Sequence, residues 1–283
     1  LVVAVVGVNF ILFIRAYKHD AEEAMMAKAA SFTAVADEAK ALQSQSMRHG
    51  AVDVKGLLAD AKAQIATGKT YRDTKFFTAI PVVFGWTAAG QAAKREGLEF
   101  KVPAFQARNK DNEPATGSFR AKLLQRLTEE FKAKGTESLG EIDDKTNTLH
   151  YMRAIKLDVS CMTCHGNPTA QTDPDGDGKD VLGFTMEGWK AGDIHGAYEV
   201  AVPLDMVDQQ VAGFIKQGLL YSVPVAGACL IAFFWMIRRH VARPMENLVT
   251  RTREDARRLQ DKVQAMLGRL NGQILRLDRK STR

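Results

Sequence analysis

The stretch "LHYMRAIKL", Leu149 to Leu157, alternates as a half-buried β-strand does, with the odd-numbered residues on one face. A second stretch, "IHGAYEVAVPL" at 194–204, alternates in the same way and places His195 on the odd-numbered face with Ala197, Glu199 and Ala201. A third, "EFKVPAF" at 99–105, is a predicted strand whose proline marks an edge or an end. Together these stretches predict a small antiparallel sheet.

Helical patterns precede the sheet. From about residue 20 to 46 the apolar residues recur at intervals of three and four, which predicts a long helix continuing from the apolar start of the chain. Shorter helices are predicted near 57–65 and after Pro81, where proline suits a first helical turn. Helices followed by a small sheet make the predicted fold class α+β.

Three residues after the end of the first strand, at Leu157, comes "SCMTCHGNP", Ser160 to Pro168, which contains a C-x-x-C-H motif. This spacing is typical of c-type haem attachment, in which Cys161 and Cys164 form thioethers with the vinyl groups and His165 becomes the proximal iron ligand. A thioredoxin-like dithiol, a zinc knuckle and a structural disulfide are the alternatives. The third cysteine of the chain, Cys229, lies in an apolar run and cannot reach the motif.

Other residues are candidates for contacts with one covalent haem. Met47 and His49 are the favoured distal ligands, because they end the long helix that enters the membrane; an open or water-filled position is the alternative. His195 is a less favoured ligand, because a histidine at such a position is more often hydrogen-bonded within the sheet or to a haem propionate than bound to the iron. Arg108 and Arg153 are candidate partners of the propionates. The remaining candidates for the distal position are His150, Met152 and Met186.

The stretch "DPDGDGKD", Asp173 to Asp180, matches the first half of an EF-hand loop. Its twelfth position holds Phe184 in place of the required acid. We therefore interpret it as an acidic turn first and only as a weak calcium site second.

Two uncharged apolar runs flank the sheet region. Residues 218–237 form a run of 20 residues, enough for a helix across a bilayer core of about 30 Å. Residues 1–14 form a shorter run that we interpret as a first span truncated upstream, because the chain starts on Leu1 without an initiator Met; a signal peptide is the alternative. The predicted organisation is a first span at 1–18, an external domain at 19–210, a second span at 211–237 and a cytoplasmic segment at 238–283.

The charge distribution supports this topology. The chain carries a net charge of +6, and residues 238–283 hold 13 Lys/Arg against 5 Asp/Glu, so the rest of the chain is slightly acidic. Basic residues directly after a span mark the cytoplasmic side, which places the motif outside the membrane, where haem c is attached. No recognition motif accompanies the basic tail, so a nucleic-acid partner is not expected.

The tail has helical periodicity. Apolar residues recur at intervals of three and four at Thr252, Ala256, Leu259, Val263, Met266, Leu270, Ile274 and Leu277. This spacing favours a two-stranded coiled coil and a parallel homodimer, although Gly268 and Gly272 weaken the helix. An isolated amphipathic helix lying on the membrane is the alternative.

Several stretches resemble a known family: "FFTAIPVVFGW", "FQARNKDNEP", "TNTLHYMRAI", "CMTCHG" and "LGFTMEGWKAGDIHGAYEV". In this order they resemble the periplasmic c-type haem, PAS-like sensor domain of bacterial chemotaxis receptors and related signalling proteins. The resemblance implies covalent haem at Cys161, Cys164 and His165, and sensing of redox state or a small ligand. Some relatives use a distal cysteine from the helical region, where this chain has none.

The stretch "RRHVARPMENLVTRTRE", from Arg238 on, resembles the start of a HAMP linker, but no clear second HAMP helix follows. We expect a membrane-anchored sensor in the bacterial cytoplasmic membrane, with its haem domain in the periplasm and signalling through a partner or a larger membrane complex. The alternative is an electron-transfer cytochrome c subunit of such a complex. No acid–base pair is evident near the motif, so we do not expect an enzyme.

Overall fold

The computed structural model describes the backbone of residues 2–281 and the side chains of residues 5–269 and 272. It divides into two units, residues 1–212 and 213–283, which are described separately. The first unit begins with α1 (Val2–Arg48), a single helix of 47 residues that contains the predicted helix at 20–46. Near its start, Val6 and Leu12 are exposed. The apolar run is thus helical, and its role as a membrane span stays a prediction.

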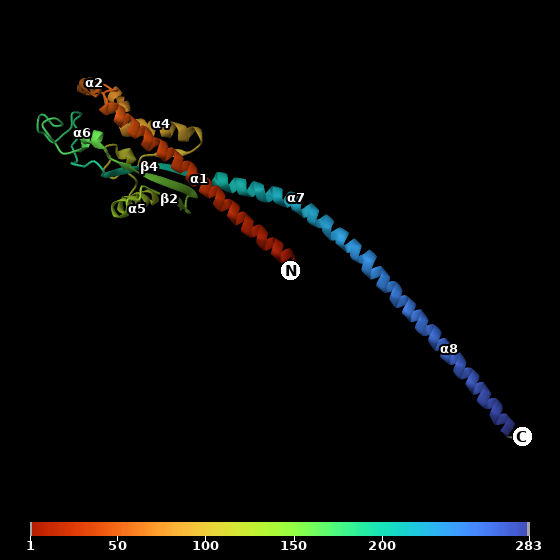
Figure 1. Cartoon of the computed structure of the whole chain (residues 1–283). Coiled ribbons are helices and arrows are strands. Elements are labelled where there is room, and N and C mark those ends of the chain that lie inside the picture. Colours follow the sequence, from red (N-terminus) through yellow and green to blue (C-terminus); the bar gives the residue numbers. More distant parts are fainter. Residues whose placement is uncertain (1, 282–283) are drawn as a thin grey trace. The chain divides into compact units, whose positions relative to one another are not determined.

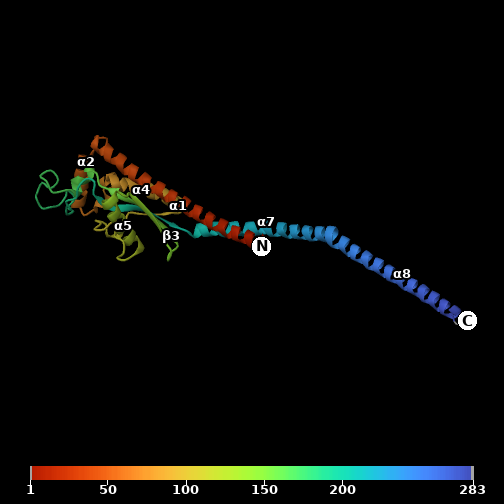
Figure 2. The same cartoon turned by 60° about the horizontal axis from the view of Figure 1, so that its bottom comes forward.

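Three shorter helices follow α1. They are α2 (Val54–Ala66), α3 (Lys75–Ala79) and α4 (Pro81–Arg95), with a 3-10 turn η1 (Tyr71–Asp73) before α3. Pro81 opens α4 as the sequence predicted, because its missing N–H costs nothing in a first helical turn. Helix α4 lies along α1, and Figures 1 and 2 show the two helices side by side.

The sheet has four antiparallel strands in the order β1-β4-β3-β2. These are β1 (Glu99–Lys101), β2 (Ser138–Asp143), β3 (Thr148–Lys156) and β4 (Ile194–Pro203). The long central strands β3 and β4 are the two alternating stretches of the sequence. Strand β1 is shorter than predicted, and Pro103 lies beyond its end. Strand β2 was not predicted.

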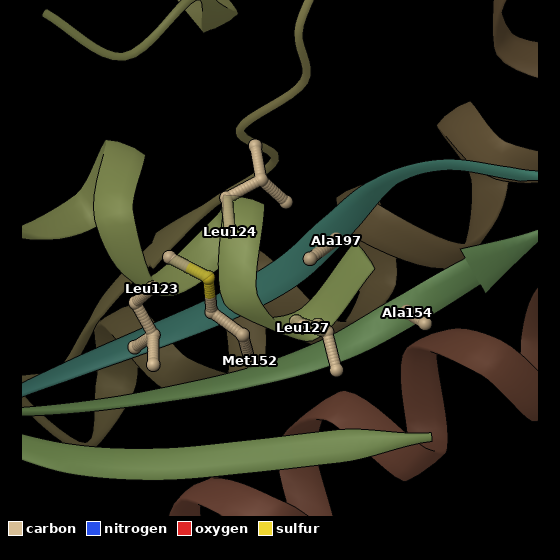
Figure 3. Close-up of a cluster of buried hydrophobic side chains, with 6 residues drawn as sticks. All are labelled: Leu123, Leu124, Leu127, Met152, Ala154 and Ala197. Carbon is tan, nitrogen blue, oxygen red and sulfur yellow. The ribbon is translucent and has the colours of Figure 1, made fainter. Parts of the chain in front are cut away.

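Helices cover both faces of the sheet. On one face α5 (Phe119–Lys134) packs Leu123, Leu124 and Leu127 against Met152, Ala154 and Ala197, as Figure 3 shows. On the other face α1 packs against β3 and β4 and α4 packs against β1, and Ala36 and Ala89 share a buried cluster with Ile155 and Tyr198. Small alanines on both helices let their backbones approach the strands closely. The arrangement confirms the predicted α+β class.

A bulge interrupts the pairing of β3 with β4. Ala154 pairs with Ala197, but Lys156 pairs with Ile194, so β4 holds one extra residue, and Gly196 has a φ of 77° that favours glycine. The alternation of side chains therefore changes at the bulge. Ala197 packs against α5, whereas His195 lines a cavity together with Ile155, on the face covered by α1 and α4. The prediction that His195 shares a face with Ala197 was wrong for this reason.

The second unit continues a helix that begins in the first. Helix α7 (Asp205–Ile237) contains Pro224, is followed by a π-helical turn η4 (Arg238–Ala242), and leads into α8 (Arg243–Ser281). Among the described residues, one helix, at 205–269, is long and apolar enough to cross a membrane; its most apolar window has a mean hydropathy of 2.0 and none of it is buried. In α8, Leu259, Val263 and Met266 are exposed. The side chains of Leu270, Ile274 and Leu277 lie outside the described residues.

Candidate functional site

The C-x-x-C-H motif lies just after β3, at the end of the domain where α1 finishes (Figure 1). A 3-10 turn η3 (Val159–Cys161) runs directly into the single-turn helix α6 (Met162–His165). Cys161 and Cys164 are three residues apart in this helical segment, so both side chains lie on the same side of it. Gly166 ends the turn, and its backbone N–H donates to the Met162 carbonyl oxygen. A β-carbon at this position would come within 2.7 Å of the same oxygen, so the site requires glycine.

The motif forms one wall of a cavity. Cys161, Cys164 and His165 line it from one side, and Met47 lines it from the last turn of α1. Most of the remaining wall is aromatic and aliphatic, with Trp86 and Phe184 among its residues. The lining is thus largely apolar, with a few sulfur and nitrogen atoms facing inwards. Such a setting suits a flat apolar group held by a small number of polar contacts.

His165 is held by its Nδ1 atom. This nitrogen lies 2.8 Å from Glu187 Oε2, and since a carboxylate accepts, Nδ1 is the donor and Nε2 is the nitrogen that the carboxylate leaves unengaged. Trp189 stacks on the imidazole, with ring centroids 5.0 Å apart and 13° between the planes. The backbone N–H of Trp189 also donates to the His165 carbonyl, at 2.8 Å. The ring is therefore oriented with one nitrogen available for a metal.

Arg108 connects the motif to the loop that follows it. Its guanidinium donates to Glu187 Oε1 at 3.0 Å, to the buried Asp180 Oδ2 at 2.7 Å and to the Cys164 carbonyl at 2.8 Å. Burial raises the pKa of Glu187, but the hydrogen bonds from His165 and Arg108 outweigh it and lower that pKa to about 2. Arg108 lines the cavity, with its donors engaged by the protein; its pairing with a propionate stays a prediction.

The two motif cysteines are free and protonated. Burial raises the pKa of Cys161, and burial together with the negative charge of Asp180 raises the pKa of Cys164 to about 12. Redox-active dithiols instead need a lowered thiol pKa, so this environment does not favour the thioredoxin-like alternative. In the described part of the chain, the group of three side chains placed to hold a metal is Asp173, Asp175 and Asp177, which does not include the motif. The zinc-knuckle alternative therefore lacks its further ligands.

The structure separates the candidate distal ligands. Met47 and His195 line the cavity, whereas His49 lies beyond the end of α1 and is exposed. His195 packs against Trp189, with ring centroids 4.0 Å apart, and burial lowers its pKa to about 4. His195 is therefore a neutral imidazole beside the motif.

The other candidates lie away from the cavity. His150 lies 2.6 Å from the fully buried Glu199, which also pairs with Arg120, while Met152 belongs to the core beneath α5. Met186 is buried outside the cavity lining. Arg153 does not line the cavity, and its Nε atom donates to Thr33 of α1 at 3.4 Å.

The acidic turn is a separate feature. Carboxylate oxygens of Asp173, Asp175 and Asp177 lie within 4.8 Å of one another. Asp173 already accepts hydrogen bonds from the backbone N–H groups of Asp177 and Gly178, and Phe184 packs edge-on against Tyr71. These contacts account for an acidic turn, and calcium binding there stays a weak candidate.

Sequence reasoning did not connect three residues to the site: Asp180, which it placed in the acidic turn, Glu187 and Trp189. All lie in the irregular segment between α6 and β4, where no periodicity or spacing identifies a role. Their importance follows from chain folding, which brings the segment back onto His165.

Comparison with known proteins gives two findings. The Tll0287-like family model matches residues 18–203, from within α1 to the end of β4, and includes the motif. Among solved structures, the chain matches the crystal structure of the cyanobacterial haem protein Tll0287, whose sequence is 20% identical to this chain. The match covers 56% of this chain and 95% of that protein's chain, with a TM-score of 0.32. No curated protein matches the chain. These findings give no support to the chemotaxis-receptor family that the sequence resembled.

Proposed function

The chain belongs to the Tll0287-like family, and from that premise we propose that it is a non-enzymatic haem protein carrying one covalent haem c. Cys161 and Cys164 would hold the vinyl carbons as thioethers, and His165 would ligate the iron. The cofactor would supply a redox-active iron that binds small ligands. The proposed role is a sensor of redox state or of such a ligand, with its PAS-like domain in the periplasm.

One observation carries the haem assignment. Two free, protonated thiols lie on one side of a helical segment, and the adjacent histidine has Nδ1 engaged and Nε2 available, all at one apolar cavity. Thioether formation needs two cysteine sulfurs beside the ring, and iron ligation needs an unprotonated imidazole nitrogen. The residues present therefore fit the group.

Met47 is the distal ligand that we favour over His49, because it lines the cavity from α1. The same end of α1 is bonded to the motif segment: Ser44 Oγ donates to Asp158 Oδ2 at 2.6 Å and lies 2.9 Å from Ser160 Oγ. A change of ligation at Met47 would thus act on a helix already attached to the chain entering Cys161. This attachment supports a signal carried along α1.

The membrane part of the proposal rests on the apolar segment within α7 and the basic residues after it. We propose a cytoplasmic membrane location with residues 238–283 inside the cell, where a parallel homodimer along α8 would pass the signal to a partner. An electron-carrier subunit of a larger membrane complex is the alternative. An electron carrier would exchange electrons with a neighbouring redox centre, and α1 would not move when the ligation of the iron changes.

The test is the optical spectrum of the purified full chain. We expect a c-type pyridine haemochrome spectrum, with covalent haem lost in the double variant C161A/C164A and kept in C229A, which removes the remaining cysteine. The reason is that thioether attachment depends on both motif sulfurs. A wild-type chain without a c-type spectrum, or covalent haem in the double variant, contradicts the assignment.

The same preparation tests the distal ligand. Met47→Ala should change the reduced and oxidised spectra and increase CO binding, while His49→Ala should leave both as in the wild type. If both replacements leave the spectra unchanged, ligation from the end of α1 is wrong. Spectra in membranes that change only on addition of an electron donor protein would favour the electron-carrier alternative.

A further inference from the structure

We propose that Glu187 is a positioning residue that lowers the reduction potential of the site by accepting a hydrogen bond from His165. The inference rests on the proposed function, because it requires iron on Nε2 of the same imidazole. It goes further, since it identifies the residue that sets the potential at which the site would change state.

The geometry places the Glu187 carboxylate between two donors. Oε2 lies 2.8 Å from Nδ1 of His165, and Oε1 lies 3.0 Å from Nε of Arg108. Arg108 in turn donates to the carbonyl of Cys164, so the carboxylate is fixed relative to the turn that carries the histidine. A carboxylate on the second nitrogen of a ligating histidine fixes the ring and makes the ligand more basic.

The charges around His165 act in the same direction. Arg108 lies between two carboxylates, Asp180 and Glu187, so the group carries one net negative charge beside the imidazole. His165 and Glu187 are both about four-fifths shielded from solvent, which limits screening of that charge. Oxidation adds one positive charge at the iron, and a nearby negative charge stabilises the more positive state. Glu187 should therefore favour the oxidised form.

Trp189 separates the effect of the Glu187 charge from the effect of fixing the His165 ring. Its indole stacks on His165, and its backbone N–H donates to the His165 carbonyl, so the ring stays packed when the carboxylate is changed. The amide of glutamine has the shape of the carboxylate and retains an acceptor oxygen. Glu187→Gln thus removes mainly the charge.

The experiment is a spectroelectrochemical titration of the full-chain holoprotein. In E187Q we expect the ratio of oxidised to reduced protein at a fixed potential to fall at least tenfold, which is a positive shift of about 59 mV for a one-electron couple. Glu96→Gln is the matched control. Glu96 is exposed and pairs with Lys28, and neither residue belongs to the C-x-x-C-H motif or to the contacts of His165. This replacement should leave the potential unchanged.

The outcomes are distinguishable. A wild-type chain without covalent haem contradicts the proposed function itself. An E187Q protein with a c-type spectrum and the potential of E96Q overturns the role of Glu187 and leaves the proposed function standing. If E187Q does not yield holoprotein, Glu187→Ala supplies the test: it removes the same charge and also the hydrogen bond to His165, so the potential should again become more positive, and an unchanged or more negative potential overturns the inference.

Discussion

Ser44 is a buried hydroxyl on α1 that ties the helix to the segment entering the motif. It donates to Asp158 at 2.6 Å, and Asp158 also accepts from the backbone N–H of Ser160 at 2.7 Å. Ser44→Ala should destabilise the domain by about 1–2 kcal/mol, because it removes a hydrogen bond to a charged group in a buried setting. Denaturant unfolding of the full chain in detergent, followed by circular dichroism, measures the change.

The matched control is Ser31→Ala on the same helix. Ser31 is exposed and bonds only within its own helix, to the Ala27 carbonyl, so its replacement should change the unfolding free energy by less than about 0.5 kcal/mol. Equal effects of the two replacements would mean that the contact from α1 to Asp158 does not stabilise the fold.

At the residue scale the sequence predicted the motif but not its surroundings. Cys161, Cys164 and His165 could be assigned because their chemistry depends on spacing along the chain, which a sequence displays directly. Glu187 lies 22 residues after His165 and reaches it only because the intervening loop folds back. Contacts of that kind depend on tertiary structure, and a single sequence carries no local signal for them.

The packing of α1 against α4 depends on Gly85. A β-carbon at this position would lie 2.3 Å from the backbone carbonyl oxygen of Ala36, so Gly85→Ala must push the helices apart. We expect a loss of about 1–3 kcal/mol of stability, typical of overpacking between well-packed elements. Because Met47 lies on α1, the reduced spectrum of the holoprotein should also change.

Gly90 on the same helix is the control for Gly85. Its nearest contact would be Phe100 at 3.6 Å, an ordinary van der Waals distance. Gly90→Ala should therefore be neutral or stabilising by up to about 1 kcal/mol, because alanine favours a helix over glycine. A Gly85→Ala chain as stable as Gly90→Ala would show that the two helices are not held as closely as described.

At the element scale, hydrophobic periodicity predicted α1, α2, α4 and the central strands, but not α5 or β2. For α5 the signals were present: Ser118 caps the first turn and Gly135, at a φ of 72°, ends the helix. For β2 they were not, since every residue of "SLGEID" is half-buried and no alternation results. The bulge at Gly196 could not be predicted either, because an extra residue in a strand appears only when the partner strand is known.

The whole chain combines a slightly acidic domain with a strongly basic tail on either side of one apolar segment. In residues 213–237, Leu220, Ile231 and Phe234 are exposed, as they would be in contact with lipid. The basic residues begin at Arg238, directly after this segment. Such an order favours insertion with the tail in the cytoplasm and the domain outside.

This topology can be tested by thiol labelling of spheroplasts, which are cells whose outer membrane has been removed and whose cytoplasmic membrane is intact. In a C229A background we would introduce one new cysteine, either Asp144→Cys in the exposed turn between β2 and β3 or Thr252→Cys on α8. A membrane-impermeant maleimide should label the first in intact spheroplasts and the second only after permeabilisation, because the bilayer separates the two positions. Motif cysteines joined to haem would not react, so labelling reports the new thiols. Labelling of Thr252→Cys in intact spheroplasts, or protection of Asp144→Cys until permeabilisation, would place the domain on the wrong side for haem attachment and contradict the sensor proposal.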